Sequence, residues 1–116
     1  MLIIRESQIQ QFSDAMIRRF VSRLTDVVLD IWSSECEKFG LENINDIVNS
    51  AVIKAIEYSF YTENEISRFV HLVFILENPH FYKLQWVEPI LTNYEITQKN
   101  RMNSLWNMVR QSYFKK

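Results

Sequence analysis

Residues 62–76 read Thr-Glu-Asn-Glu-Ile-Ser-Arg-Phe-Val-His-Leu-Val-Phe-Ile-Leu, and this stretch decides the fold class. It opens with a capping box, in which a threonine is followed three residues later by a glutamate, so that both side chains satisfy backbone N–H groups at a helix start. The apolar residues that follow recur every three or four positions, which is the period of an α-helix. Pro79 disfavours helical backbone at the residue before it. The stretch therefore predicts a helix from about Thr62 to Glu77.

The same spacing of apolar residues continues on both sides of this helix. Upstream it predicts a long helix over Glu6–Trp32 and another from about Asn43 or Asn45 to Tyr58. Downstream, an irregular segment from Pro79 to Pro89 precedes a last helix that is expected to begin near Thr97. The main apolar stripe of the long first helix consists of Ile9, Phe12, Met16, Phe20, Leu24, Val27 and Ile31, with a second stripe, Ile17, Val21 and Val28, beside it.

Glycine and proline are scarce, and their scarcity limits what the loops can do. The 116 residues include one glycine, Gly40, and two prolines, where average usage predicts several of each. Phosphate-binding loops, nucleophile elbows and tight hairpins depend on glycine, so the chain has few ways to build a catalytic loop. No segment alternates as a strand does. We expect one all-α domain over residues 1–116, a helical bundle of four main helices plus one or two short helices.

Cysteine content and hydropathy point to a compartment. A single cysteine, Cys36, excludes an internal disulfide and is typical of a reducing environment. No apolar run approaches the roughly 18 residues that cross a bilayer, and the apolar start, Met1–Ile4, is too short for a secretory signal. We therefore expect a cytoplasmic protein that does not associate with membranes.

Charge is unevenly distributed although the net charge is −1. Residues 26–95 carry four basic and twelve acidic side chains, whereas residues 96–116 carry five basic and no acidic ones. The basic C-terminal helix supports an alternative function, that of a small helical regulatory or nucleic-acid-associated protein. Nucleic-acid-binding domains are usually basic overall, so nucleic acid is not the expected partner.

The residue types that carry most enzyme chemistry are few and lie far apart. A zinc site needs three or four cysteine or histidine ligands, and the chain has three such residues in all, Cys36, His71 and His80. Glutamates on both sides of Cys36 raise the pKa of its thiol, which is the wrong direction for a nucleophile. His71 lies among apolar residues and is interpreted as a histidine at the edge of the core. We expect no catalytic residue, no metal and no cofactor.

Aromatic side chains in the irregular segments form the best-defined candidate surface. Phe81, Tyr82 and Trp86 fall within the eleven residues between the two prolines, and Tyr61 belongs to a similar cluster that ends the preceding helix. Aromatic residues in such segments often anchor protein interfaces. The alternative interpretation is that they cover the open end of the bundle. Our hypothesis is that Phe81, Tyr82, Trp86 and Tyr61 contact a partner protein.

Roughly half of the chain resembles a known protein family. The resemblance lies in three stretches, which are Ile4–Leu24, Ala51–Leu76 and Trp86–Leu91. The order of predicted elements resembles that of a family of small all-helical proteins. This order is a long amphipathic helix, a capped helix, an aromatic loop and a final helix. Members of that family are encoded beside spike and toxin genes in type VI secretion clusters of Gram-negative bacteria. Members often carry a glycine at two turns, where this chain reads Tyr58-Ser59-Phe60 and Leu76-Glu77-Asn78.

The resemblance implies a non-enzymatic, protein-binding accessory of a type VI secretion effector or toxin cluster. Such an accessory acts as an effector chaperone or adaptor, or as an immunity protein that blocks a toxin. The implied partner is a cognate secreted effector, toxin or spike protein. A homo-oligomer is compatible with either function, because helical domains of this size often bury an aromatic face against a second copy.

Overall fold

The computed structural model describes residues 13–111, and all regular secondary structure in this range is helical. The prediction of an all-α fold is thereby confirmed for these residues, which form six α-helices, five of them seven residues or longer. The helices are α2 (Asp14–Ile31), α3 (Ser33–Phe39), α4 (Ile44–Glu57), α5 (Glu63–Ile75), α6 (Glu88–Leu91) and α7 (Gln98–Val109), and two 3₁₀ turns, η1 (Leu41–Asn43) and η2 (Phe81–Lys83), lie between them.

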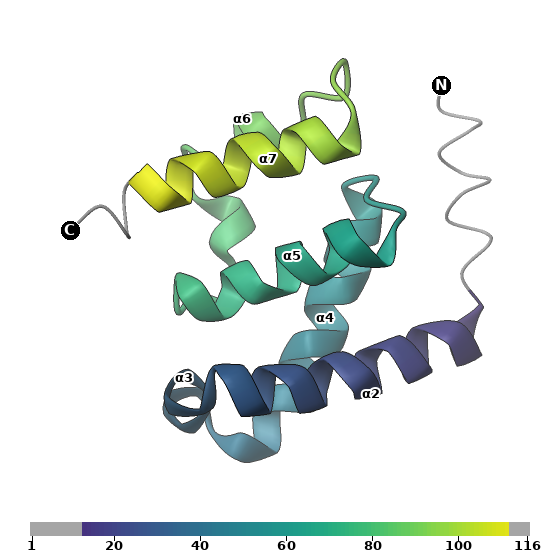
Figure 1. Cartoon of the computed structure of the whole chain (residues 1–116), viewed down its shortest axis with the longest axis vertical. Coiled ribbons are helices and arrows are strands. Elements are labelled where there is room, and N and C mark those ends of the chain that lie inside the picture. Colours follow the sequence, from purple (N-terminus) through teal and green to yellow (C-terminus); the bar gives the residue numbers. More distant parts are fainter. Residues whose placement is uncertain (1–12, 112–116) are drawn as a thin grey trace.

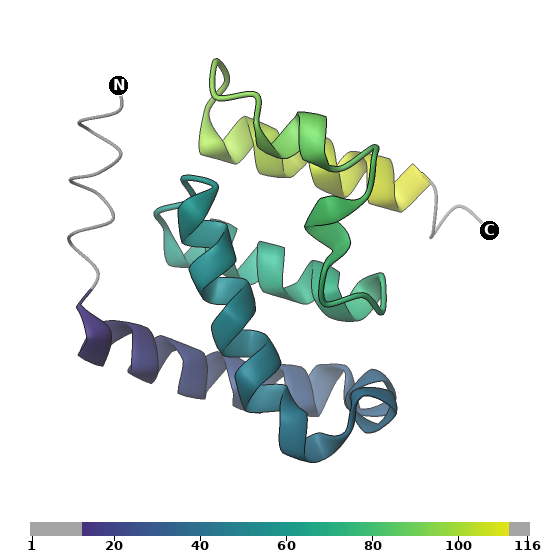
Figure 2. The same ribbon diagram turned by 180° about the vertical axis from the view of Figure 1, so that it is seen from behind.

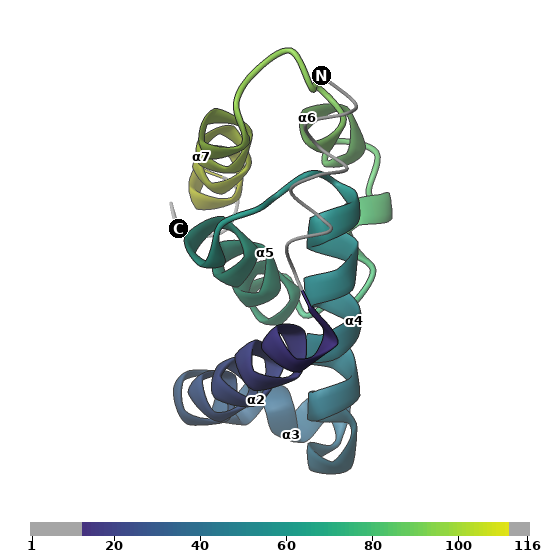
Figure 3. The same cartoon turned by 90° about the vertical axis from the view of Figure 1, so that its right-hand side faces the viewer.

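The arrangement of the helices differs from a simple bundle. In Figure 1, α7, α5 and α2 lie one below the other with similar directions, while α4 crosses behind α5 and α2. Figure 3 shows the same two layers from the side. α5 is the central helix, because it packs against α2, α4 and α7. The helix with the clearest start signal in the sequence is therefore also the one around which the core forms.

α5 begins at the predicted Thr62 cap, but the Glu65 carboxylate contacts the Thr62 hydroxyl and not a backbone N–H. The hydroxyl oxygen of Thr62 accepts a hydrogen bond from the backbone N–H of Glu65 at 3.2 Å and donates one to Glu65 Oε1 at 2.7 Å. The carboxylate of Glu65 is buried, and its Oε2 accepts a hydrogen bond from Asn64 and lies 3.5 Å from Arg68 Nη1. These contacts compensate the buried charge and satisfy a free N–H of the first turn.

α2 begins later than the sequence predicts. Ser13 has an extended backbone, with φ −75° and ψ 159°, and its Oγ accepts a hydrogen bond from Met16 N. A helix that runs without a break from Glu6 is therefore wrong, because the backbone of Ser13 is extended rather than helical. Residues 1–12, including the possible extended stretch Leu2–Ile4, lie outside the described residues.

The buried face of α2 also differs from the prediction. Phe20 and Leu24 of the main stripe are buried together with Val21 and Val28 of the second stripe, whereas Met16, Val27 and Ile31 of the main stripe are 45%, 39% and 56% exposed. α2 lies at the edge of the layer and packs mainly against α4. Other described residues cover only one side of α2. Because the apolar surface of the helix is broader than that side, some of its apolar residues remain exposed.

α4 and α5 end in the same backbone motif, and neither motif contains a glycine. In each, two N–H groups beyond the cap donate to carbonyls three and five residues earlier. After α4, Ser59 N donates to Ile56 O and Phe60 N donates to Ala55 O. After α5, Glu77 N donates to Phe74 O and Asn78 N donates to Val73 O. This is the Schellman motif, whose residue after the cap adopts a positive φ and is usually glycine. That residue is Ser59 (φ 71°) in one turn and Glu77 (φ 53°) in the other.

We expect Ser59→Gly to stabilise the protein by about 1 kcal/mol. The left-handed conformation costs a residue with a side chain roughly 1–2 kcal/mol, and glycine loses about 0.5–1 kcal/mol through greater freedom in the unfolded chain. The substitution also removes the Ser59 hydroxyl, which is buried without a hydrogen-bond partner, and a desolvated polar group of this kind is unfavourable. The free energy of unfolding in urea measures the effect.

Ser59→Ala is the matched control, because it removes the hydroxyl and keeps the Cβ in the left-handed conformation. We expect the alanine variant to recover only the part of the stabilisation that comes from the hydroxyl. A glycine variant less stable than the wild-type protein would contradict the assignment of backbone strain to this turn.

Candidate functional site

The structure separates the four aromatic residues that the sequence proposes as partner contacts. Phe81 is fully buried, with its ring centroid 4.8 Å from that of Phe69. The expectation of a surface contact therefore does not hold for Phe81, because η2 directs this ring into the core. Tyr82, Trp86 and Tyr61 are half-buried. Each of these three has ring area at the surface that a partner can reach.

Tyr82 belongs to a cluster of three tyrosines that the sequence does not group. Tyr58 follows α4, Tyr82 lies in η2 and Tyr94 lies in the loop before α7, and all three are half-buried. The ring centroids of Tyr58 and Tyr82 are 6.2 Å apart, and the Arg101 guanidinium contacts both the carbonyl of Tyr58 and the ring of Tyr94. We call these three residues, together with Lys54 and His80, the tyrosine face. In Figure 2, α4 and the segment through η2 and α6 are turned toward the viewer.

The phenol of Tyr82 is held by polar neighbours. His80 Nδ1 and the Tyr82 hydroxyl oxygen lie 3.0 Å apart and form a hydrogen bond. Lys54 Nζ lies 5.1 Å from the centroid of the Tyr82 ring, a cation–π distance, and forms an ion pair with Glu57 at 3.0 Å. The hydrogen bond to Glu57 raises the pKa of Lys54. Lys54 therefore stays charged, and the cation–π contact restrains the ring.

The other side of the tyrosine face rests on the core. Phe69 is fully buried, and its ring centroid lies 6.3 Å from that of Tyr58 and 6.5 Å from that of Tyr82. Burial raises the pKa of Tyr58, and Lys54 partly opposes that effect. Tyr58 therefore stays a neutral phenol at physiological pH. A neutral phenol is a hydrogen-bond donor and acceptor on an apolar ring, which suits recognition better than nucleophilic chemistry.

Arg101 joins the segments that hold the tyrosines. Its side chain is 3% exposed on α7 and donates hydrogen bonds to the carbonyls of Tyr58 (2.7 Å), Leu91 (2.8 Å) and Ser59 (3.2 Å). The guanidinium carbon also lies 5.1 Å from the centroid of the Tyr94 ring. One side chain thus connects the end of α4, the end of α6 and the loop before α7. The sequence marks this residue only as one of several basic residues of the last helix.

The residues with potential enzyme chemistry lie apart from the tyrosine face. Cys36 is buried, and burial raises the pKa of its thiol. Among residues 13–111, no group of three or more histidine, cysteine, aspartate or glutamate residues is arranged to hold a metal ion. His71 is half-buried and its Nδ1 accepts a hydrogen bond from Trp32 Nε1 at 2.8 Å. That nitrogen must be unprotonated, so His71 is a neutral imidazole in this fold.

We expect the stability of the protein to rise with pH through the range just below 6.5. Burial lowers the pKa of His71 from its ordinary value of 6.5. Between the folded and the unfolded pKa the unfolded chain therefore binds more protons than the folded one, and stability increases with pH. The contribution of His71 is complete above its unfolded pKa and is lost as the pH falls through its folded pKa. Urea unfolding at steps between about pH 8 and pH 5 measures this dependence.

His71→Gln tests this assignment, because glutamine does not titrate and its amide oxygen can still accept a hydrogen bond from Trp32. We expect the variant to show a flatter pH dependence in that range. His80→Gln is the control, since it removes an exposed histidine and leaves the pair of Trp32 and His71 intact. The interpretation fails if His71→Gln keeps the wild-type slope.

No helix within residues 13–111 has both the length and the apolar character needed to cross a membrane. Comparisons with protein families, with curated proteins and with solved structures find no match to this chain. The tyrosine face is therefore interpreted from its own geometry. Its rings come from three separate segments, and those of Tyr58 and Tyr82 lie beside the buried Phe69. Lys54 lies over the Tyr82 ring and Arg101 over the Tyr94 ring.

Proposed function

We propose that this protein is a non-enzymatic protein-binding module whose partner docks on the tyrosine face. The observation that carries this proposal is the gathering of three half-buried tyrosines from three segments: Tyr58 and Tyr82 have neighbouring rings, and Arg101 links Tyr58 to Tyr94. Tyrosine is enriched at protein interfaces and among the residues that contribute most to their binding energy.

The packing of the face favours binding in a second way. Tyr82 is restrained by His80, by Lys54 and by the underlying ring of Phe69. A side chain that is already ordered loses little conformational entropy when a partner covers it. Lys54, Glu57 and the exposed Glu88 supply charge around the rings. An aromatic centre with a polar rim is the usual anatomy of a specific protein interface.

The class of partner is proposed from the family resemblance. We assign a cognate secreted effector, toxin or spike protein of a type VI secretion cluster, bound in the cytoplasm of the producing cell. An effector chaperone or adaptor and an immunity protein use the same kind of contact. They differ in the result of binding: a chaperone raises the level and loading of its effector, and an immunity protein blocks the toxin.

The basic composition of the C-terminal helix suggests a nucleic-acid-associated protein, but the placement of its basic side chains gives this alternative little support. Arg101 is 3% exposed and is engaged with backbone carbonyls. Lys99 and Arg110 remain exposed in the described part of this segment, and Lys115–Lys116 lie outside it. Phosphate contacts by lysine and arginine provide most of the affinity for nucleic acid. We therefore do not propose this function.

Titration calorimetry tests the proposal. The purified protein is titrated with each toxin, effector and spike protein encoded beside its gene, and we expect one of them to bind. Tyr82→Ala is then expected to weaken that complex by about tenfold or more, as loss of a central interface residue does. Leu41→Ala is the control, because Leu41 is 59% exposed in η1, outside the tyrosine face. Equal binding by both variants contradicts the placement of the interface, and absence of a binder contradicts the partner class.

A second measurement separates the two proposed roles. The partner is expressed in cells with and without this protein, and growth and partner level are recorded. Rescue of growth at an unchanged partner level indicates an immunity protein. A higher partner level without rescue from a toxin indicates a chaperone or adaptor.

A further inference from the structure

One side of α2 carries both apolar and charged side chains. Seven large apolar residues are exposed within residues 13–111, and three of them lie on this helix: Met16, Val27 and Ile31. Together with Phe20 and the charged positions 19, 23, 26 and 30, they recur every three or four residues and so share one side of the helix. We call this side, which consists of positions 16, 19, 20, 23, 26, 27, 30 and 31, the α2 face.

The charges of the α2 face are sorted by sign along the helix. The first half carries Arg19 and Arg23, the second half carries Asp26 and Asp30, and all four are exposed. Arg23 pairs with Glu63 at 3.1 Å. The other three form no ion pair with any residue of the described range 13–111. A surface that is basic at one end and acidic at the other is complementary to a second copy of itself in the antiparallel orientation.

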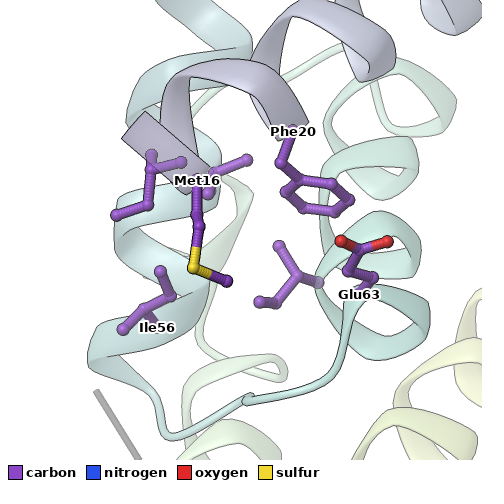
Figure 4. Close-up of a pocket in the computed structure, with 7 residues that line it drawn as sticks. Met16, Phe20, Ile56 and Glu63 are labelled. Carbon is purple, nitrogen blue, oxygen red and sulfur yellow. The ribbon is translucent and has the colours of Figure 1, made fainter. Parts of the chain in front are cut away.

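The apolar residues of the α2 face also differ between its two ends. At the beginning of α2, Met16, Ile17 and Phe20 line an apolar hollow whose other walls belong to α4 and α5 (Figure 4). At the end of α2, Ile31 is 56% exposed and Val27 is 39% exposed. One end therefore provides a recess, and the other end provides uncovered apolar side chains.

We propose that two copies of this chain associate through their α2 faces, antiparallel, about a two-fold axis that passes near Leu24. Such an axis places residue i of one copy opposite residue j of the other, and j opposite i. The midpoint of each facing pair falls within half a residue of Leu24, so one axis relates them all. The four pairs are Arg19 with Asp30, Arg23 with Asp26, Met16 with Ile31, and Phe20 with Val27.

This arrangement satisfies both ends of the face at once. Ile31 of each copy covers the hollow of the other, while the arginines of each copy face the aspartates of the other. Charged pairs beside an apolar contact set the orientation of paired helices. The α2 face contains no residue of the tyrosine face, so a partner protein and a second copy occupy different surfaces.

The proposed contact is small, so the dimer is weak. α2 has 18 residues and is therefore about 27 Å long. Interfaces that bury less than about 1,200 Å² in total are typical of weak associations. We expect a dissociation constant on the order of 10–100 µM.

Sedimentation velocity of the full-length protein tests this expectation. We expect a monomer at about 2 µM and a dimer as the main species at about 500 µM, as mass action requires for that dissociation constant. A protein that is still monomeric at the higher concentration overturns the proposal.

Exchange of charge tests the antiparallel register. Arg19→Asp and Asp30→Arg, made separately, each replace two opposite-charge contacts by two like-charge contacts. We expect each variant to raise the dissociation constant by at least about tenfold. In an equimolar mixture, the new aspartate of one variant faces the new arginine of the other, and the unchanged Asp30 faces the unchanged Arg19. The mixture is therefore expected to dimerise as the wild-type protein does, which also shows that both variants are folded. A mixture that stays monomeric, or single variants that dimerise normally, overturns the proposed register.

Replacement of Ile31 tests the apolar contact. Ile31→Ser is expected to raise the dissociation constant several-fold, because it removes the side chain that covers the hollow of the other copy. Ile53→Ser is the matched control, since Ile53 is 42% exposed on α4, outside the α2 face, and is expected to leave the dissociation constant unchanged. Equal dimerisation of the Ile31 variant and the wild-type protein, or a loss of the dimer in the Ile53 variant, overturns the placement of the interface.

Discussion

Replacement of Arg101 by methionine is expected to lower the free energy of unfolding by about 3 kcal/mol. Methionine keeps much of the side-chain volume but leaves three carbonyl groups without the hydrogen bonds that Arg101 donates. The bonds to Ser59 and Leu91 are buried, and the bond to Tyr58 is partly buried. Each buried acceptor left unsatisfied costs roughly 1–3 kcal/mol. Removal of a buried charge offsets part of this loss, because its desolvation penalty disappears as well. Urea denaturation at neutral pH measures the difference.

Two variants make this prediction specific. Arg110→Met removes an exposed arginine just beyond α7 and is expected to change stability by less than about 0.5 kcal/mol. Arg101→Lys keeps the charge, but a compact ammonium group cannot reach three carbonyls on three segments as the planar guanidinium does. We expect the lysine variant to fall between methionine and wild type. A methionine variant as stable as the wild-type protein would show that the desolvation penalty outweighs the hydrogen bonds.

Replacement of Phe69 by alanine is expected to lower the free energy of unfolding by about 4 kcal/mol. Phe69 is fully buried on the central helix, and its ring lies 4.8 Å from that of Phe81 and 6.0 Å from that of Phe60, measured between centroids. Its removal leaves a cavity between α4, α5 and η2, where surrounding rings cannot collapse without distorting the turns that hold them. The rings of Tyr58 and Tyr82 lose the same support.

Phe69→Leu is the conservative variant and is expected to cost less than about 1.5 kcal/mol. Phe39→Ala is the positional control, because Phe39 on α3 is half-buried and contacts Phe74 at a centroid distance of 5.6 Å. We expect it to cost less than half as much as Phe69→Ala. Equal costs at the two positions would contradict the view that the core is centred on α5.

Signals contained within a few residues were sufficient to predict much of the fold. The capping box at Thr62 and Glu65 locates the start of α5, and Thr97 caps α7, with its hydroxyl oxygen accepting from Asn100 N. Both signals are local hydrogen bonds across three residues, so they require no knowledge of the rest of the molecule. The short helix α6 was also predicted from a local signal, because Pro89 is tolerated in the first turn of a helix.

The candidate site could be predicted only in part. Tyr82 was identified because an aromatic residue in an irregular segment often contacts a partner, yet the adjacent Phe81 has the same sequence signal and is fully buried. The geometry of η2 decides which of the two rings faces the core. Tyr58 and Tyr94 were missed as members of the face, because they come from segments far apart in the sequence.

The sequence by itself determined the helical class, the order of the helices and the caps of α5 and α7, because apolar periodicity and hydrogen bonds near a helix end act within one or two turns. The tertiary structure alone decided which residues of the two apolar stripes of α2 are covered, since that depends on where α4 crosses the helix. It also decided that Arg101 holds backbone carbonyls in the core and that Trp32 pairs with His71 across 39 residues. These contacts join residues distant in the chain, and only the packing of whole helices against one another brings them together.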